Sequence, residues 1–315
     1  MKKATYAKNR LSEHAFFERN LMLVARHTFL VRLRYAFQSR RDLYLVTDYF
    51  AGGSLEDALK RVEDRKGLGR DAARFIVAEL SLGLDYLHAR DVLHRDIKAA
   101  NVLLDTEGHA HLCDFGLAKC VENNNQGPKR SFAGTVEYMA PELLRKGDEA
   151  PSPALDWWAL GVLLVETCQG KTPFRASTPR QLMLNIIREA PQIIGDDEKF
   201  RSAVEKLLHK RASRRLRSAA QLAKRRFFEP LDFAKLERKE LVPPFTPRAG
   251  RVPNVPDQGL VKKFGPHRPS DGDSPQQKGG SDEVSLSFKG EQFQGFSVFA
   301  SPAPPVRRKS SKDLK

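Results

Sequence analysis

Hydrophobic side chains follow two different periods in the first part of the chain. In segment 12–24 they recur on one side of a helical pattern, with charged residues on the other, which predicts an amphipathic helix. Segments 29–37 and 43–48 are rich in β-branched and aromatic residues and enclose a short polar stretch, which predicts a β-hairpin. The pair Gly52-Gly53 then interrupts the chain, and Ser54 is expected to cap the helix that follows.

Helical spacing dominates the middle of the chain. Apolar residues in 71–89 recur at the period of a helix, and similar patterns cover 153–169 and 181–188 and continue to about residue 228. Beyond residue 228 the sequence becomes rich in proline, glycine and serine, which predicts an extended tail without a hydrophobic core of its own. The expected fold class is therefore α+β, with a small β-containing part, a larger helical part and a tail within 315 residues.

Basic residues outnumber acidic ones, and the net charge is +15. Much of the excess lies in 206–226, a stretch without any acidic residue. Its cations are Lys206, Lys210, Arg211, Arg214, Arg215, Arg217, Lys224, Arg225 and Arg226. A solvated helical surface is the simplest interpretation of such a stretch. Binding to nucleic acid or to an anionic membrane is the alternative, and nucleic acid is not expected as a partner.

Cysteine usage and the distribution of apolar segments indicate an intracellular protein. The three cysteines, Cys113, Cys120 and Cys168, form neither a metal-ligand spacing nor a disulfide pattern, which suits a reducing compartment. The first residues are charged and lack the apolar stretch of a signal peptide, and the apolar run 160–165 is too short to span a bilayer. The expected location is the cytoplasm, with the nucleus left open, and no transmembrane segment is expected.

Three short motifs point to one kind of chemistry. The sequence His-Arg-Asp-Ile-Lys-Ala-Ala-Asn occupies 94–101, Asp-Phe-Gly follows at 114–116, and Ala-Pro-Glu at 140–142. They match, in order and at workable spacings, the motif set of phosphoryl-transfer enzymes that act on proteins. The opposing interpretation, turn residues of an unrelated fold, would have to explain all three motifs at once.

Each residue type in these motifs suits a step of phosphoryl transfer. Asp96 is the candidate that accepts or orients the proton of the substrate hydroxyl, and Lys98 can reach the transferred phosphate. Asn101 and Asp114 offer amide and carboxylate oxygens to Mg²⁺. Arg95 is suited to pair with a phosphate on the loop between Asp114 and the Ala-Pro-Glu motif.

With these motifs, the chain resembles the AGC group of eukaryotic serine/threonine protein kinases, near its ribosomal-protein-kinase and Akt-like branches. Segment 12–19 is similar to the group's αC helix, 43–49 to its fifth strand and hinge, and 134–139 to the segment before Ala-Pro-Glu. Arg215 matches a late arginine that would pair with Glu142. The resemblance covers essentially the whole chain and implies a bilobal kinase fold that uses ATP and Mg²⁺ to phosphorylate protein substrates.

The same resemblance assigns residues to the nucleotide site. It implies that Asp48 and Phe50 lie at the edge of the adenine ring and that Leu103 lies beneath the ring. It also makes Glu18 the carboxylate that would pair with the lysine of the group's third strand.

The tail carries three further matches. Segment 243–247 resembles the group's Pro-Pro-Phe segment, 273–275 its turn motif, and 293–297 its hydrophobic motif. The resemblance implies two regulatory phosphosites in the tail, Ser274 and Ser297. It implies a third before the tail, Ser131, as the target of an upstream kinase. It also implies that Phe293 and Phe296 dock on the small lobe.

Two upstream elements of the group are absent from this sequence. There is no Gly-rich phosphate loop, and no third strand with its lysine, since Lys2 and Lys3 resemble the lysines that follow that strand. An incomplete sequence is favoured over a true truncated form. In the hydrophobic motif, Val298 stands where an aromatic residue is usual.

The substrate side departs from the group as well. The catalytic loop, with His94 and Ala99-Ala100, resembles the STE group of kinases. Ser54 and Ala100 stand where basophilic AGC kinases carry the glutamates that bind a substrate arginine. A weakened preference for arginine upstream of the target residue is therefore expected.

Together these features predict two parts. A kinase domain is expected over 1–228, with a small-lobe remnant at 1–48 and a large lobe at 52–228, and a regulatory tail over 229–315. The expected function is that of a serine/threonine protein kinase, which transfers the γ-phosphate of ATP to serine and threonine hydroxyls. The alternative is a catalytically impaired kinase-like scaffold or gene fragment that lacks the phosphate loop and the third-strand lysine.

Overall fold

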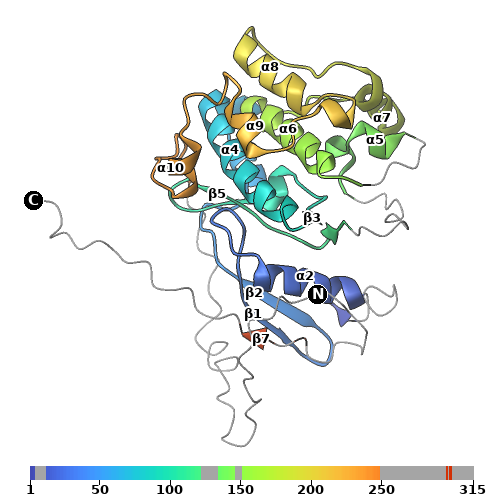
Figure 1. Cartoon of the computed structure of the whole chain (residues 1–315), viewed down its shortest axis with the longest axis vertical. Coiled ribbons are helices and arrows are strands. Elements are labelled where there is room, and N and C mark those ends of the chain that lie inside the picture. Colours follow the sequence, from blue (N-terminus) through green and yellow to red (C-terminus); the bar gives the residue numbers. More distant parts are fainter. Residues whose placement is uncertain (4–11, 122–133, 146–150, 249–295, 297, 300–315) are drawn as a thin grey trace, which may run out of the picture.

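The chain folds into a small lobe and a large helical lobe joined by a hinge at residues 48–54 (Figure 1). The structure is a computed structural model, and it describes residues 1–3, 12–121, 134–145, 151–248, 296 and 298–299. The small lobe contains helix α2 (Ser12–Val24) and strands β1 (Leu33–Gln38), β2 (Leu43–Thr47) and β7 (Val298–Phe299). The bilobal α+β architecture agrees with the fold class predicted from the sequence.

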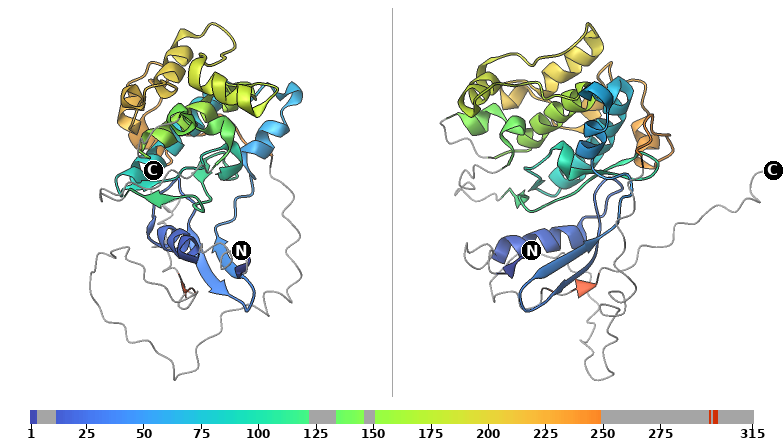
Figure 2. Two further views of the ribbon diagram at one scale, coloured as in Figure 1. Left: turned by 90° about the vertical axis from the view of Figure 1, so that its right-hand side faces the viewer. Right: turned by 180° about the vertical axis from the view of Figure 1, so that it is seen from behind.

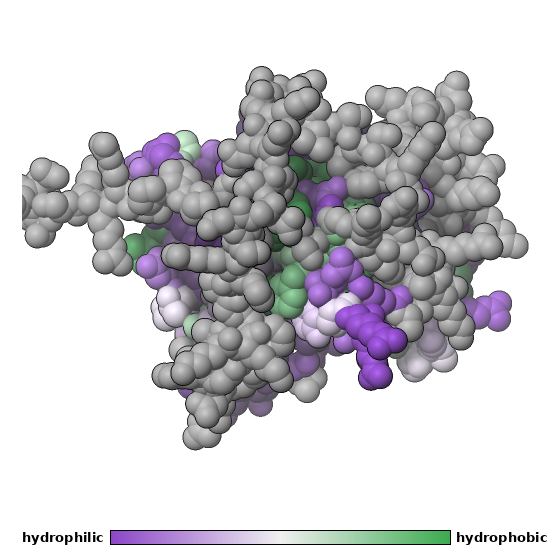
Figure 3. Space-filling model, turned by 90° about the horizontal axis from the view of Figure 1, so that it is seen from below, coloured by the Kyte–Doolittle hydropathy of each residue, from purple (hydrophilic) through white to green (hydrophobic). Residues whose placement is uncertain are grey.

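The small-lobe sheet has the strand order β2-β1-β7, and α2 packs along one of its faces (Figures 1 and 2). Helix α2 has the predicted bounds, and β1 and β2 form the predicted antiparallel hairpin, with Phe37 opposite Tyr44. Leu33, Ala36 and Leu43 are buried against the helix side. Seen from below, the coloured part of the surface mixes hydrophilic and hydrophobic residues (Figure 3).

Strand β1 begins at Leu33, whereas the sequence pattern predicted a strand from residue 29. The difference arises because residues 29–31 pair with the large lobe instead. The Leu112 N–H donates to the Phe29 carbonyl at 2.9 Å, and the Val31 N–H donates to the Leu112 carbonyl at 2.9 Å. These two hydrogen bonds join the two lobes behind the hinge.

Residues 1–3 lie along the other edge of β2. The Lys3 N–H donates to the Arg41 carbonyl at 2.9 Å, and the Leu43 N–H donates to the Met1 carbonyl at 2.8 Å. The Lys3 ammonium group donates to Gln38 Oε1 at 2.6 Å.

The large lobe is built around two helices, α4 (Gly69–His88) and α6 (Ala154–Gln169). The other helices are α3 (Leu55–Lys60), α5 (Pro141–Leu144), α7 (Pro179–Arg188), α8 (Glu198–Leu207), α9 (Ala219–Ala223) and α10 (Phe233–Glu237). The short strands are β3 (Val92–Leu93), β4 (Val102–Leu104), β5 (Ala110–Leu112) and β6 (Lys119–Cys120), which pair as β3-β6 and β4-β5. Helix α6 is apolar nearly all round, as a helix in the centre of a core should be.

Local signals place several helix boundaries correctly. Ser54 caps α3, because its hydroxyl oxygen accepts the Asp57 N–H at 3.0 Å. Helix α6 ends at Gly170, whose φ of +72° is the left-handed conformation that glycine adopts without strain.

The first part of the tail packs on the large lobe. Helix α10 buries Leu236 fully, and Phe228 and Phe233 meet edge to face with ring centroids 6.5 Å apart. A Cβ atom on Gly108 would come within 1.9 Å of the Phe245 carbonyl oxygen, so the chain passes directly over this turn. The sequence predicted no helix here, since five residues are too few to show a period.

Within the described residues, no helix is both long and apolar enough to cross a bilayer. No disulfide joins Cys113, Cys120 and Cys168, all of which lie in the part of the chain that the structure describes.

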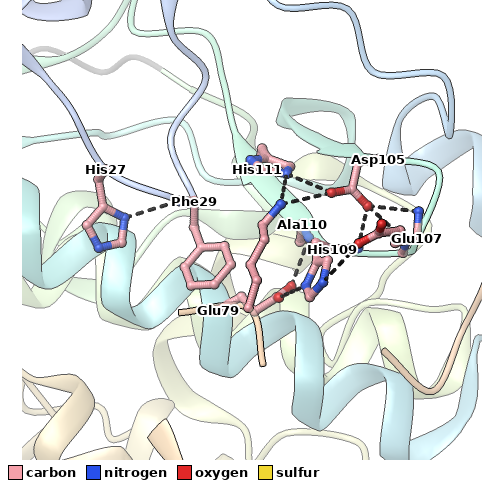
Figure 4. Close-up of polar contacts among 10 residues, drawn as sticks. His27, Phe29, Glu79, Asp105, Glu107, His109, Ala110 and His111 are labelled. Carbon is pink, nitrogen blue, oxygen red and sulfur yellow. Dashed lines mark hydrogen bonds and ion pairs between the residues drawn. The ribbon is translucent and has the colours of Figure 1, made fainter. Parts of the chain in front are cut away.

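The junction of the lobes contains a histidine that is expected to make stability depend on pH. Burial lowers the pKa of His27 to about 4, and the nearby Arg90 acts in the same direction. Its Nδ1 accepts the Phe29 N–H at 3.2 Å, so folding favours the neutral ring (Figure 4). A lowered folded-state pKa contributes stability that is present above the unfolded pKa of 6.5 and is lost as pH falls toward 4. Between pH 7 and pH 4.5 the wild type should therefore lose about 2 kcal/mol more stability than His27→Gln.

Urea unfolding at the two pH values measures this difference. His14→Gln, which removes an exposed histidine from α2, is the matched control and should follow the wild type. Parallel loss of stability in the wild type and His27→Gln would contradict the expectation.

Candidate active site

The loop between β3 and β4 gathers three of the predicted catalytic residues around one carboxylate. The Lys98 ammonium group donates to Asp96 Oδ2 at 2.6 Å, and Asn101 Nδ2 donates to the same oxygen at 2.8 Å. Asn101 Nδ2 also donates to the Asp96 carbonyl at 2.8 Å. Because its amide nitrogen is used in this way, the Asn101 side-chain oxygen is left as an acceptor.

Asp156, on the first turn of α6, holds the start of this loop in place. Its carboxylate accepts the N–H groups of His94 at 2.9 Å and Arg95 at 2.8 Å, and it contacts His88 Nε2 at 2.8 Å. Burial alone would raise the pKa of Asp156, but these partners lower it. The bonds also stabilise the left-handed backbone of Arg95, whose φ is +68°. No role for Asp156 was predicted from the sequence, although an acidic residue in the first turn of an apolar helix is a usable signal.

Asp114 lies beside the catalytic loop because β4 and β5 are paired. The register sets Val102 opposite Leu112, and the Cys113 N–H donates to the Asn101 carbonyl at 2.9 Å. Asn101 and Asp114 thus flank the same end of this hairpin. A carboxylate and a free amide oxygen are suitable ligands for Mg²⁺, so the donor set fits that ion.

The Asp-Phe-Gly segment has a defined backbone. Asp114 has a φ of +62°, and its Oδ1 accepts the Gly116 N–H at 3.2 Å. Phe115 is fully buried and meets the His94 ring edge to face at 5.2 Å.

Helix α2 brings Glu18 to the same region. The Glu18 Oε2 atom lies 3.8 Å from the position that a Cβ on Gly116 would occupy. Burial raises the pKa of Glu18 to about 7, the Asp114 charge raises it too, and the Met1 amino group acts in the opposite direction. Glu18 therefore faces another carboxylate across the site.

The residues predicted to surround adenine lie where the hinge meets β4. The Asp48 carboxylate accepts from Arg34 Nε at 2.5 Å, so its side chain turns toward β1. The Gly52 N–H donates to the Leu104 carbonyl at 3.0 Å, and Ser54 forms a β-bridge with Leu103. The Phe50 ring packs on the ring of His111 at 4.5 Å. His111 lies outside the motifs that marked the site in the sequence.

Arg215 and Glu142 form a buried pair with two parallel bonds. Nη1 donates to Glu142 Oε1 at 2.7 Å and Nη2 donates to Oε2 at 3.0 Å. Nη1 also donates to the Ala154 carbonyl at 2.5 Å, and the guanidinium lies 5.0 Å from the centre of the Trp158 ring. The pair fastens the start of α5 to the core helix α6.

The tail returns to the small lobe at Phe296. This residue is fully buried, and its ring meets Phe16 of α2 edge to face at 5.6 Å. The Arg19 guanidinium lies 5.3 Å from the Phe296 ring centre, and β7 pairs with β1 through Val298. Four other residues predicted for regulation lie outside the described residues: Ser131, Ser274, Phe293 and Ser297.

Comparison with known proteins agrees with this geometry. Residues 1–228 match the family model of the protein kinase domain. The chain is 39% identical over 272 residues to the serine/threonine-protein kinase Sgk2 of Mus musculus, covering 84% of this chain and 71% of that protein. It is 38% identical over 255 residues to ribosomal protein S6 kinase 2 beta of Xenopus laevis, covering 78% and 39%. The chain therefore belongs to the protein kinase family and, within it, to the AGC group of serine/threonine kinases.

Proposed function

We propose that this chain transfers the γ-phosphate of ATP to serine and threonine hydroxyls of protein substrates. The observation that carries the proposal is the convergence of Lys98 and Asn101 on the Asp96 carboxylate. Asp96 is then placed to receive the proton of an incoming hydroxyl. The Lys98 ammonium group, 2.6 Å from that carboxylate, offsets the charge that develops on the transferred phosphate.

Asn101 and Asp114 would hold Mg²⁺, through the free amide oxygen and the carboxylate. When bound, Mg²⁺ neutralises charge on the phosphate oxygens of ATP. Phe50 and Leu103 would enclose the adenine ring, and Asp48 would contribute its backbone, since its side chain is engaged by Arg34.

The acceptor peptide would lie in the hollow next to Lys98. Ala100, Thr135 and Tyr138 line this hollow, and the Tyr138 hydroxyl bonds to the Glu166 carboxylate. Ala100 provides no charge, and the Ser54 hydroxyl donates to Asp57 Oδ2 at 2.7 Å within the cap of α3. Neither position supplies a carboxylate for a substrate arginine, which supports a weak arginine preference.

A library of peptides with fixed serine, threonine or tyrosine tests this proposal. We expect phosphate on serine and threonine and little on tyrosine, with less than about a tenfold gain from arginine three residues upstream, the scale of one weak charge contact. Labelling of tyrosine would contradict the proposed acceptor. A strong arginine gain would show that other carboxylates near the hollow, such as Glu56 or Glu137, replace the missing ones.

The tail, residues 229–315, is proposed to regulate the domain 1–228. Burial of Phe296 against α2 supports a docked tail. A docked tail would act on the site through α2, because this helix carries Glu18 toward Asp114. Phosphorylation of Ser131 by an upstream kinase would add a phosphate that the Arg95 guanidinium is suited to bind. Ser274 and Ser297 are proposed as further sites of the same kind.

A further inference from the structure

A polar cluster around Asp105 and His111 joins the tail to the large lobe (Figure 4). Lys239, just after α10, donates to Asp105 Oδ2 at 2.9 Å and lies 3.3 Å from His111 Nε2. Because an ammonium group only donates, the contact with Lys239 requires an unprotonated Nε2, and Nε2 also lies 3.4 Å from Asp105 Oδ2. Burial lowers the pKa of His111, in agreement with a neutral ring. Its side chain is only 7% exposed, so these contacts fix its orientation.

The same histidine reaches the hinge on its other side. It lies opposite Leu103 in the β4-β5 register, and its ring packs against Phe50 at 4.5 Å with an angle of 42° between the planes. The hinge is joined to β4 next to this contact, since the Leu104 N–H donates to the Gly53 carbonyl at 2.9 Å. His111 therefore contacts one residue proposed for the adenine site and is paired with another.

We propose that His111 is a positioning residue for the adenine site, and that Lys239 of the tail sets its orientation. The inference rests on the proposed function for the identity of the nucleotide. The imidazole ring turns about a soft torsion, and the Lys239 bond selects the rotation that presents its face to Phe50. The start of the tail thus acts on the hinge through a side chain, without reaching the nucleotide itself.

The contact of Lys239 can be removed without dismantling the turn around it. Asp105 Oδ1 holds the turn by itself, because it accepts the N–H groups of Glu107, Gly108 and His109 at 2.9–3.0 Å. The next residue is held independently, since Glu79 Oε2 accepts the Ala110 N–H at 2.8 Å (Figure 4). Loss of the Lys239 ammonium group therefore acts mainly on His111.

Five variants of the full chain test the proposal: Lys239→Met, Lys235→Met, His111→Leu, His111→Gln and the double variant Lys239→Met with His111→Leu. Lys235 is the matched control, an exposed lysine in the same tail segment. Glutamine restores an acceptor for Lys239, whereas leucine removes it and keeps the bulk. The first readout is hydrogen–deuterium exchange at the Gly52 and Leu104 amides, and the second is the affinity for adenosine, which has no phosphate and so does not depend on the metal site.

Lys239→Met and His111→Leu should each raise exchange at these two amides and weaken adenosine binding about 5- to 10-fold. Lys235→Met and His111→Gln should keep the exchange rates and the adenosine affinity of the wild type. The double variant Lys239→Met with His111→Leu should lose no more adenosine affinity than either single variant. Unchanged exchange in Lys239→Met, or additive losses, would overturn the proposal. Failure of the proposed function would look different: no protein would bind adenosine, while exchange at the hinge would still respond to Lys239→Met.

Discussion

Replacing Arg215 by methionine is expected to lower the free energy of unfolding by about 3–5 kcal/mol. The Arg215 side chain is fully buried and that of Glu142 is 9% exposed, so the substitution removes the cation that forms two parallel bonds with the Glu142 carboxylate in a dry environment. The Ala154 carbonyl loses its donor in the same step. Breaking one partner of such a pair is costly mainly because the other charge stays behind.

Urea unfolding of three proteins separates this cause from lost packing. Arg217→Met removes an exposed arginine two residues away and should cost less than about 0.5 kcal/mol. The double variant Arg215→Met with Glu142→Met removes both charges and should recover a large part of the loss. A cost below about 1 kcal/mol for Arg215→Met would mean that Glu142 finds water or another donor.

Replacing Asp114 by asparagine is expected to weaken Mg²⁺-dependent ATP binding by about 100-fold or more. The substitution keeps the size of the side chain, and asparagine tolerates the φ of +62° at this position, so the fold should be preserved. What it removes is the negative charge that would offset a divalent cation. Asn101 would remain with a neutral oxygen, which cannot hold Mg²⁺ by itself.

Asp91→Asn is a closely matched control for that experiment. Asp91 also has a positive φ, +56°, and is an exposed aspartate outside the proposed site. Calorimetry of ATP binding with and without Mg²⁺ should give the wild-type affinity for Asp91→Asn. For Asp114→Asn it should give only a weaker affinity that does not depend on Mg²⁺. Equal binding by both variants would remove Asp114 from the metal site.

Local patterns predicted the parts of this fold that local forces determine. The amphipathic period gave the bounds of α2, and the cap at Ser54 lies where its hydroxyl can accept the Asp57 N–H. The motif at 94–101 similarly predicted that Asp96 and Asn101 belong to one site. Their fixed spacing in one loop brings the two side chains together.

Contacts between distant residues were beyond such patterns. Residues 29–31 have strand composition, yet they bond to Leu112 of the other lobe, so β1 starts later than predicted. Lys239 and Asp105 are 134 positions apart, and neither α10 nor the role of His111 can be read from a short window.

The basic stretch 206–226 gives the same lesson about charge. Composition favoured a solvated surface for the whole stretch, whereas the family resemblance singled out Arg215, which is buried against Glu142. The Lys210 ammonium group donates to the Ile186 carbonyl at 2.6 Å and lies 4.2 Å from the Phe174 ring centre. Composition does not distinguish buried from exposed cations, because the packing of α6 and α7 determines the partners of each one.

The most direct test of the proposed kinase activity is transfer of labelled γ-phosphate from Mg²⁺-ATP to a serine-containing protein substrate by the purified 315-residue chain, beside Asp96→Asn. We predict label on serine with the wild type and a rate lower by about 10²–10⁴-fold with Asp96→Asn, because asparagine cannot accept the hydroxyl proton. Transfer that survives Asp96→Asn, or no transfer by a folded chain that binds Mg²⁺-ATP, would contradict it.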